Sequence, residues 1–163
     1  MKILVCGGAG YIGSHMAKVL YTLGHDIVSF DNLSTGNLWA LKWGEFVEGD
    51  LLNQADLDNL FSQYQFDLVM HFSAKALVEE STRNPGIYYK NNVLGTNNLI
   101  ETMLKNKVNK LIFSSTGAVY GNQATDLISE SHPKNPINPY GQSKLASEYM
   151  LKDYCEAYDL KTV

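Results

Sequence analysis

A glycine-rich turn near the start of the chain is the feature that most restricts the possible folds. Residues 3–16 read ILVCGGAGYIGSHM, an apolar run that passes through four glycines into a helical pattern. Glycines at a strand-to-helix junction leave backbone N–H groups uncovered at the positive end of the helix dipole, where they attract an anion. The spacing fits both Gly8-x-Gly10-x-x-Gly13 and Gly7-x-x-Gly10-x-x-Gly13. The turn therefore predicts a site for a phosphate or diphosphate group.

Short apolar runs alternate with longer helical patterns along the rest of the chain. We expect buried strands and helices in turn, the strands at 2–7, 26–30, 45–49, 67–74 and 110–115, and the helices at 11–23, 56–64, 87–105 and 140–158. Parallel strands joined by right-handed helical crossovers restrict the topology to a doubly wound α/β sheet. We therefore predict a Rossmann fold with three layers, α/β/α, as a single domain over residues 1–163.

Two long connections, at 32–44 and 121–139, interrupt this alternation. The second contains Pro133, Pro136 and Pro139, a composition typical of a surface loop over a ligand site. The last residues, DLKTV, then have the pattern of another strand. Because a sheet that ends on an opening strand is unfinished, we expect this chain to be the first part of a longer protein whose substrate domain is missing.

The composition excludes several classes of partner. With 17 acidic and 13 basic residues and a formal net charge of -4, the chain lacks the basic excess needed to bind nucleic acid or an anionic membrane. Its N-terminal apolar run is too short for a signal peptide or a membrane span. Cys6 and Cys155 form no disulfide or zinc pattern, and the histidines have no metal-ligand spacing. We expect a cytoplasmic protein with no metal site, in which His71 is a satisfied core residue.

An acidic residue follows the glycines at the distance expected of a dinucleotide site. Asp31 lies at the end of the second predicted strand, 18 residues after Gly13. A carboxylate there accepts hydrogen bonds from the adenosine ribose hydroxyls and repels a 2′-phosphate, so NAD is favoured over NADP. Asp50 follows the third strand, where it is equally consistent with the adenine end of the cofactor and with a helix cap.

A tyrosine and a lysine four residues apart begin the fourth predicted helix. Tyr140 and Lys144 share one helix face, and an adjacent ammonium and a nicotinium charge both favour the phenolate form of a tyrosine. The pair is therefore a candidate general base with its charge partner. Ser114, Ser115 and Thr116 end the fifth predicted strand at the carboxyl edge of the sheet, where open α/β folds bind ligands. We expect one of these hydroxyls to bind a substrate hydroxyl.

Six motifs in a fixed order carry a family resemblance. They are the glycine turn, DNLSTG, MHFSA, YYKNNVLGT, FSSTGAVYG and NPYGQSK. Together they resemble the extended short-chain dehydrogenase/reductase family over essentially the whole chain, and within it the UDP-glucose 4-epimerases. The resemblance implies catalytic roles for Thr116, Tyr140 and Lys144. It implies an NAD-binding domain whose cofactor contacts are Gly7, Gly10, Tyr11, Ile12, Asp31, Asn32, Ser34, Asp50, Leu51, Phe72, Ser73, Ala74, Asn91, Ser114, Tyr140 and Lys144.

The resemblance also implies an activity and an assembly. Such an enzyme interconverts UDP-glucose and UDP-galactose through hydride transfer with NAD and a 4-keto intermediate, and it pairs as a homodimer through a four-helix bundle. A dehydratase is disfavoured, because Gly117 and Ala118 stand where its acid–base pair belongs. A 4-epimerase of another UDP-sugar, such as UDP-N-acetylglucosamine or UDP-glucuronate, and a noncatalytic NAD-binding module stay open. So does the role of Lys75, which is one residue early for the family's phosphate-site lysine.

Overall fold

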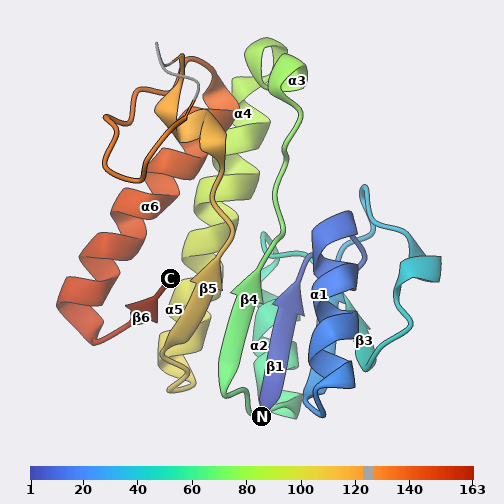
Figure 1. Cartoon of the computed structure of the whole chain (residues 1–163). Coiled ribbons are helices and arrows are strands. Elements are labelled where there is room, and N and C mark those ends of the chain that lie inside the picture. Colours follow the sequence, from blue (N-terminus) through green and yellow to red (C-terminus); the bar gives the residue numbers. More distant parts are fainter. Residues whose placement is uncertain (123–126) are drawn as a thin grey trace.

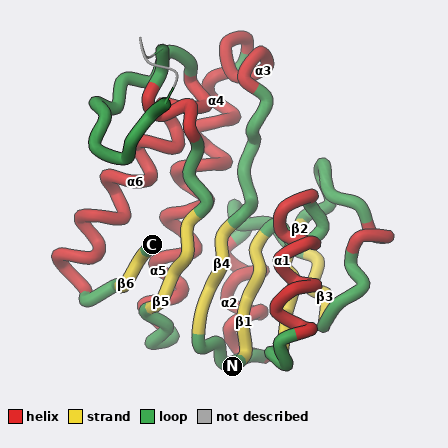
Figure 2. The backbone as a smooth tube through the Cα atoms, viewed as in Figure 1, coloured by secondary structure: helices red, strands yellow, loops and turns green. Residues whose placement is uncertain are grey.

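The computed structural model describes residues 1–122 and 127–163 and contains a six-stranded sheet (Figure 1). The strands are ordered β3-β2-β1-β4-β5-β6 (Figure 2), and the pairing shows that every neighbouring pair is parallel. The chain starts in the middle of the sheet and changes direction between β1 and β4, which confirms the predicted doubly wound fold. The strand bounds are β1 Lys2–Cys6, β2 Asp26–Asp31, β3 Glu45–Glu48, β4 Leu68–His71, β5 Lys110–Phe113 and β6 Lys161–Thr162.

Helices cover both faces of this sheet. Figure 1 shows α1 in front of the strands, with α2 and α5 behind them and α6 beside α5. The bounds of the four longest helices are α1 Tyr11–Thr22, α2 Gln54–Gln63, α5 Gly95–Lys105 and α6 Pro139–Tyr158.

Alternating side chains of β1 fill a core on each face. Ile3 and Val5 lie in one apolar cluster with Ala17 of α1. Leu4 and Cys6 lie in a second cluster, which contains buried residues of α2, α5 and α6. This period of two along a fully buried strand produces the three predicted layers.

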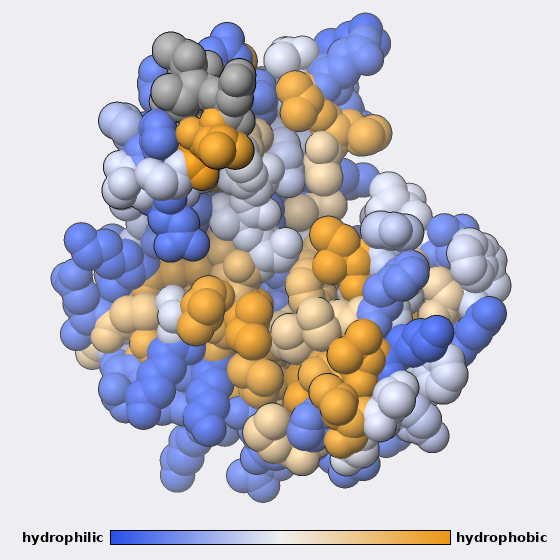
Figure 3. Space-filling view, viewed as in Figure 1, coloured by the Kyte–Doolittle hydropathy of each residue, from blue (hydrophilic) through white to orange (hydrophobic). Residues whose placement is uncertain are grey.

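The α1 face of the sheet is covered unevenly. In the part of the chain that the structure describes, α1 contacts β1 and β2, whereas β4 and β5 carry no helix on this side (Figure 1). Figure 3 shows apolar side chains gathered over β4 and β5 in the same view. The apolar side chains on this half of the face, such as Leu68 and Ile112, are only partly buried.

The third predicted helix is longer and less regular than expected. Helical backbone begins as α4 (Pro85–Tyr88), passes through a π-helical turn (Tyr89–Leu94) and continues as α5. Pro85 occupies the first turn of α4, where a missing N–H costs no hydrogen bond. The sequence pattern does not predict α3 (Val78–Arg83), a short helix directly before α4.

The two long connections contain little regular structure. The first holds one 3-10 turn, η1 (Leu38–Ala40). In the second, residues 121–122 and 127–138 form no helix or strand, and residues 123–126 lie outside the described part of the chain. The strand expected near the C-terminus is β6, which pairs with β5. Within the described ranges, no helix is both long enough and apolar enough to cross a membrane.

Candidate functional site

Tight backbone packing explains the glycines of the turn between β1 and α1. Gly7 has a φ of +80°, and a Cβ atom there would lie 2.7 Å from the backbone nitrogen of Ser73. A Cβ atom on Gly13 would lie 2.1 Å from the carbonyl oxygen of Gly7. Gly10 is the N-cap of α1 and provides no side-chain cap, so the first N–H groups of the helix have no side-chain acceptor. The turn thus presents a bare helix N-terminus.

The carboxylate of Asp31 is fixed beside this turn by two backbone donors. Its Oδ2 accepts a hydrogen bond from the backbone N–H of Ala9 at 3.0 Å, and its Oδ1 accepts one from that of Leu33 at 2.9 Å. Each carboxylate oxygen has two acceptor positions, so one on each oxygen stays available to a ligand.

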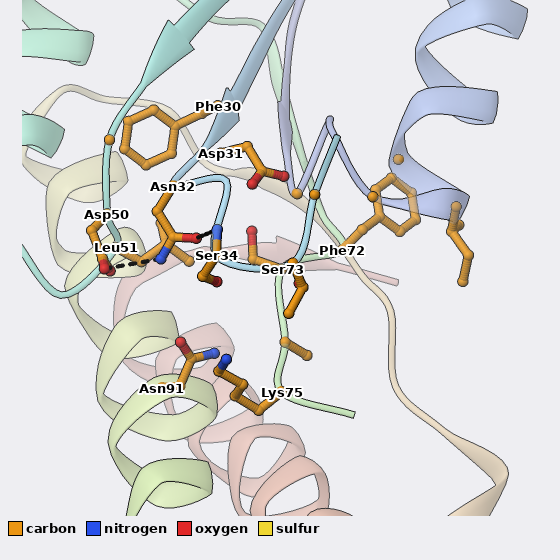
Figure 4. Close-up of a pocket in the computed structure, with 18 of the residues that line it drawn as sticks. Phe30, Asp31, Asn32, Ser34, Asp50, Leu51, Phe72, Ser73, Lys75 and Asn91 are labelled. Carbon is orange, nitrogen blue, oxygen red and sulfur yellow. Dashed lines mark hydrogen bonds between the residues drawn. The ribbon is translucent and has the colours of Figure 1, made fainter. Parts of the chain in front are cut away.

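A pocket of about 250 Å³ lies between these elements. Figure 4 shows Asp31 on one side of it and Asn91 and Lys75 on another. Thirteen of the residues expected to bind the cofactor line this pocket, namely Gly7, Gly10, Tyr11, Ile12, Asp31, Asn32, Ser34, Asp50, Leu51, Phe72, Ser73, Ala74 and Asn91. The lining also includes six residues that the sequence analysis did not assign, Gly13, Phe30, Thr35, Gly36, Gly49 and Lys75. Phe30, Thr35, Gly49 and Lys75 adjoin an assigned residue in the chain, Gly13 belongs to the glycine motif, and Gly36 follows Thr35.

Asp50 lies at one end of the pocket and is not the N-cap of α2. Its Oδ2 accepts a hydrogen bond from Nδ2 of Asn32 at 3.0 Å, and its Oδ1 accepts one from the N–H of Leu52 (Figure 4). The cap of α2 is Asn53, whose side chain accepts from the N–H of Ala55. Of the two interpretations of Asp50, the structure therefore removes the helix cap.

The proposed catalytic residues form a second group, outside the pocket lining. Asn138 caps α6 by accepting a hydrogen bond from the N–H of Gly141 at 2.8 Å, which fixes the start of the helix that carries Tyr140 and Lys144. A Cβ atom on Gly141 would lie 2.7 Å from the carbonyl oxygen of Ala118, so this first turn packs directly on the segment after β5.

That segment begins at Thr116. The Thr116 hydroxyl oxygen caps the 3-10 turn η3 (Gly117–Tyr120) by accepting a hydrogen bond from the N–H of Ala118 at 3.2 Å. Its hydroxyl proton is left to donate elsewhere. The two serines of the motif also contact the protein. The backbone N–H of Ser114 donates to the carbonyl oxygen of His71, and the Ser115 hydroxyl donates to Glu148.

Lys144 is a buried cation. Its side chain is only 2% exposed, and its Nζ lies 4.4 Å from the ring centroid of Phe113. Burial lowers the pKa of Lys144 from 10.5 to about 8, and the opposing effect of Glu148 is smaller. Among the described residues, the side chain of Lys144 forms no hydrogen bond or ion pair. Its ammonium group is therefore available to a ligand at the carboxyl edge of the sheet.

The amide of Asn92 joins the two groups, a role that the sequence analysis missed. Its Oδ1 accepts a hydrogen bond from the N–H of Lys75 at 2.8 Å, and its Nδ2 donates to the carbonyl oxygen of the same residue at 3.0 Å. The same Nδ2 donates to the Ser143 hydroxyl at 2.9 Å, and that hydroxyl donates to the carbonyl oxygen of Tyr140. The pocket wall and the start of α6 are thus tied through one buried side chain.

His71 is buried but only partly satisfied, which corrects the expectation for it. Its Nε2 lies 2.9 Å from the Thr96 hydroxyl, which donates its own proton to the carbonyl oxygen of Asn92. The hydroxyl must therefore accept from Nε2, so Nδ1 is the unprotonated nitrogen, and it has no partner among the described residues. Burial, and less strongly Lys144, lower the pKa of His71 to about 3, so the ring is neutral.

Comparison with known proteins identifies the family of this chain. The family model described as the NAD dependent epimerase/dehydratase family matches residues 3–163. The chain belongs to this family. Membership agrees with the motif resemblance, and relatives of this chain are UDP-glucose 4-epimerases.

Three members of the family illustrate the similarity. A UDP-glucose 4-epimerase of Halalkalibacterium halodurans is 46% identical over 163 residues, which are 100% of this chain and 49% of the relative. The crystal structure of UDP-glucose 4-epimerase from Brucella ovis in complex with NAD has a TM-score of 0.96 and 48% identity, covering 99% of this chain and 50% of that one. The UDP-Glc/GlcNAc 4-epimerase of Campylobacter jejuni has a TM-score of 0.94 and 46% identity, covering 99% and 51%. The chain thus spans about half the length of its relatives in this family.

Proposed function

We propose that the pocket beside the glycine turn binds NAD. The observation that carries this proposal is the bare N-terminus of α1 facing a pocket that also contains the fixed carboxylate of Asp31. Helix N–H groups would hold the diphosphate, and Asp31 would accept hydrogen bonds from the adenosine ribose. The Lys75 side chain lines the same pocket and would add positive charge near the diphosphate, which gives this residue the role that the sequence left open.

The charge of Asp31 supports NAD rather than NADP. Both of its oxygens are held by backbone donors, so the carboxylate cannot easily turn away from a ligand. A 2′-phosphate on the ribose would therefore meet a fixed negative charge.

We propose further that the chain supplies the cofactor-binding and catalytic half of a UDP-sugar 4-epimerase. Tyr140 as phenolate would take the proton from the 4-hydroxyl of the sugar, and Thr116 would orient that hydroxyl through the proton left free on its side chain. The buried ammonium of Lys144 would favour the phenolate and bind the nicotinamide ribose. When bound, NAD supplies a hydride acceptor and donor for C4. The 4-keto sugar would turn within the site, and addition of the same hydride to its opposite face would invert C4.

UDP-glucose and UDP-galactose are the substrates that the family resemblance favours. UDP-N-acetylglucosamine is the second candidate, because the similar Campylobacter jejuni protein carries both sugars in its name. UDP-glucuronate stays a third. A dehydratase is disfavoured by Gly117 and Ala118, neither of which can transfer a proton.

Cofactor binding is tested by calorimetric titration of the purified chain with NAD. We expect binding by the unchanged chain and a loss of about tenfold in affinity for Gly10→Ala, whose new methyl group would stand at the pocket wall 3.2 Å from the Gly7 carbonyl oxygen. Gly86→Ala is the matched control, because a Cβ atom there meets nothing within 4 Å. Absence of NAD binding by the unchanged chain would contradict the proposal.

Catalysis is tested by UDP-galactose turnover in the protein extended to the length of its relatives. Tyr140→Phe removes the proton acceptor and keeps the ring, so we expect a loss of at least about 100-fold in kcat with little change in NAD binding. Equal rates for both proteins would remove the catalytic role of Tyr140, and no turnover by the unchanged protein would instead indicate a noncatalytic NAD-binding module.

We also propose a homodimer formed by α5 and α6, which lie together on one face of the sheet. Tyr149 and Tyr158 of α6 are exposed there, although they are large and largely apolar. Sedimentation equilibrium measures the assembly, and a purely monomeric mass at high concentration would contradict it.

A further inference from the structure

A second pocket, of about 400 Å³, lies on the other side of the N-terminal turn of α1. Its walls are the first two turns of α1 and the segment around η1, and we call it the tryptophan pocket. The side chains that matter for its chemistry are Tyr11, His15, Lys18, Trp39, Lys42 and Trp43. None of the residues proposed for catalysis lines it, and it shares only Gly10 and Tyr11 with the cofactor pocket.

Aromatic rings dominate these walls. The chain has two tryptophans, and both line this pocket. The Trp43 ring contacts the Tyr21 ring, with centroids 5.5 Å apart, and packs against the core cluster that contains Ala17 of α1. Trp39 is 73% exposed and Tyr11 is 83% exposed. Large aromatic surfaces left in water around a hollow favour a ligand with a planar ring.

The charges of this pocket are all positive. Lys18 and Lys42 line it, and no aspartate or glutamate does. Among the described residues, neither lysine forms an ion pair, and the Nζ of Lys18 lies 6.0 Å from the ring centroid of Trp43. The net charge of the chain is -4, so this local excess of cations runs against the average of the molecule. Unpaired ammonium groups beside aromatic rings provide the complement to a negatively charged aromatic compound.

We propose that the tryptophan pocket binds an aromatic anion, a planar ring that carries a phosphate monoester. The ring would lie against Trp39 and Trp43, and the phosphate would lie between Lys18 and Lys42. The volume suits a ligand of small-molecule size, and the apolar walls with a few cations at the edge are typical of small-molecule sites. The proposal does not depend on NAD binding, because it concerns a different pocket.

The two indole groups make the test specific. In a ¹H–¹⁵N spectrum of the labelled chain, the indole N–H signals come from Trp39 and Trp43 alone, and both report on this pocket. Phenyl phosphate is the probe, with inorganic phosphate and phenol as its separate halves, each titrated to about 20 mM. The titration is repeated with excess NAD, so that binding at the glycine turn does not contribute.

We expect phenyl phosphate to shift both indole signals to saturation, with at least about fivefold higher affinity than either half alone. The double change Lys18→Gln and Lys42→Gln should weaken it about fivefold, and so should Trp39→Ala, whose exposure makes it harmless to folding. Lys110→Gln with Lys152→Gln is the matched control, since these exposed lysines do not line the pocket. Unfolding in urea checks that each variant is folded.

Three results would overturn the proposal. Indole signals that do not move with phenyl phosphate would mean that the pocket binds no such ligand. Equal affinity for phenol would indicate an apolar hollow without anion recognition. Unchanged affinity in the lysine double variant would show that the positive charges do not take part.

Discussion

Replacing the buried ammonium of Lys144 should make the protein more stable while removing a proposed catalytic group. The change is Lys144→Met, which keeps the length of the side chain and removes its charge. Lys144 is 2% exposed and has no ionic partner among the described residues. A cation in such a place costs free energy, because the unfolded chain hydrates it fully.

The magnitude follows from the pKa of this group. Burial lowers the pKa of Lys144 from 10.5 to about 8, and each pKa unit corresponds to about 1.36 kcal/mol, so the charged form costs roughly 3 kcal/mol in the folded state. The methionine variant also loses the contact between the ammonium and the Phe113 ring, which reduces the gain in stability by about 1 kcal/mol. We therefore expect Lys144→Met to raise the free energy of unfolding by roughly 2 kcal/mol at neutral pH.

The lowered pKa of Lys144 also makes the stability of the protein depend on pH. Between the folded pKa of about 8 and the unfolded value of 10.5, the unfolded chain binds more protons at Lys144 than the folded chain does. The stability of the unchanged protein therefore rises with pH in this window. The advantage of the methionine variant is complete below about pH 8 and disappears toward about pH 10.5.

Urea unfolding of both proteins at about pH 7, 9 and 10 measures this difference. Lys152→Met is the control, because Lys152 lies on the same helix with a side chain that is 72% exposed. A methionine variant that is no more stable than the parent at about pH 7, or an advantage that stays constant with pH, would refute the reasoning.

Three further predictions concern other buried groups. Gly13→Ala should destabilise the fold by at least about 1–3 kcal/mol in urea unfolding, since its Cβ would meet the Gly7 carbonyl oxygen at 2.1 Å, whereas Gly86→Ala should be tolerated. The pKa of His71 is lowered to about 3, so between about pH 6 and 3 the unfolded chain binds a proton at His71 that the folded chain does not. The free energy of unfolding should therefore fall by up to about 1.4 kcal/mol for each pH unit as the pH drops through this window. A His71→Asn variant that loses stability equally over the same window would contradict this. Asn92→Ala should cost about 2–4 kcal/mol and weaken NAD binding as well, which calorimetry and urea unfolding measure together.

The fold could be predicted from the sequence because the decisive signals are local. Apolar runs that alternate with helical patterns predict a parallel sheet covered by helices on both faces. The residues of β1 are an example, because they are buried on both faces and so form a continuous apolar run in the sequence. The glycine turn could be predicted for the same reason, because Gly7 and Gly13 are required by contacts within a few residues or at the strand beside them.

Other parts of the site depend on contacts between distant segments. Asn92 looks like any polar residue of a helix, and only the approach of Lys75 and Ser143 makes it a central hydrogen-bonding group. The free nitrogen of His71 depends in the same way on the direction in which Thr96 donates its proton. The tryptophan pocket exists because the irregular segment around η1 folds against α1, and such a segment has no periodic pattern to read.

The hydrogen bonds of the Asn92 amide should couple the motions of the two segments that they join. One planar group of fixed dimensions spans from the loop after β4 to the start of α6, so it fixes the distance between the proposed cofactor pocket and the proposed catalytic residues. Thermal motion should therefore carry both ends together, and a ligand that tightens one end would stiffen the other without any large rearrangement.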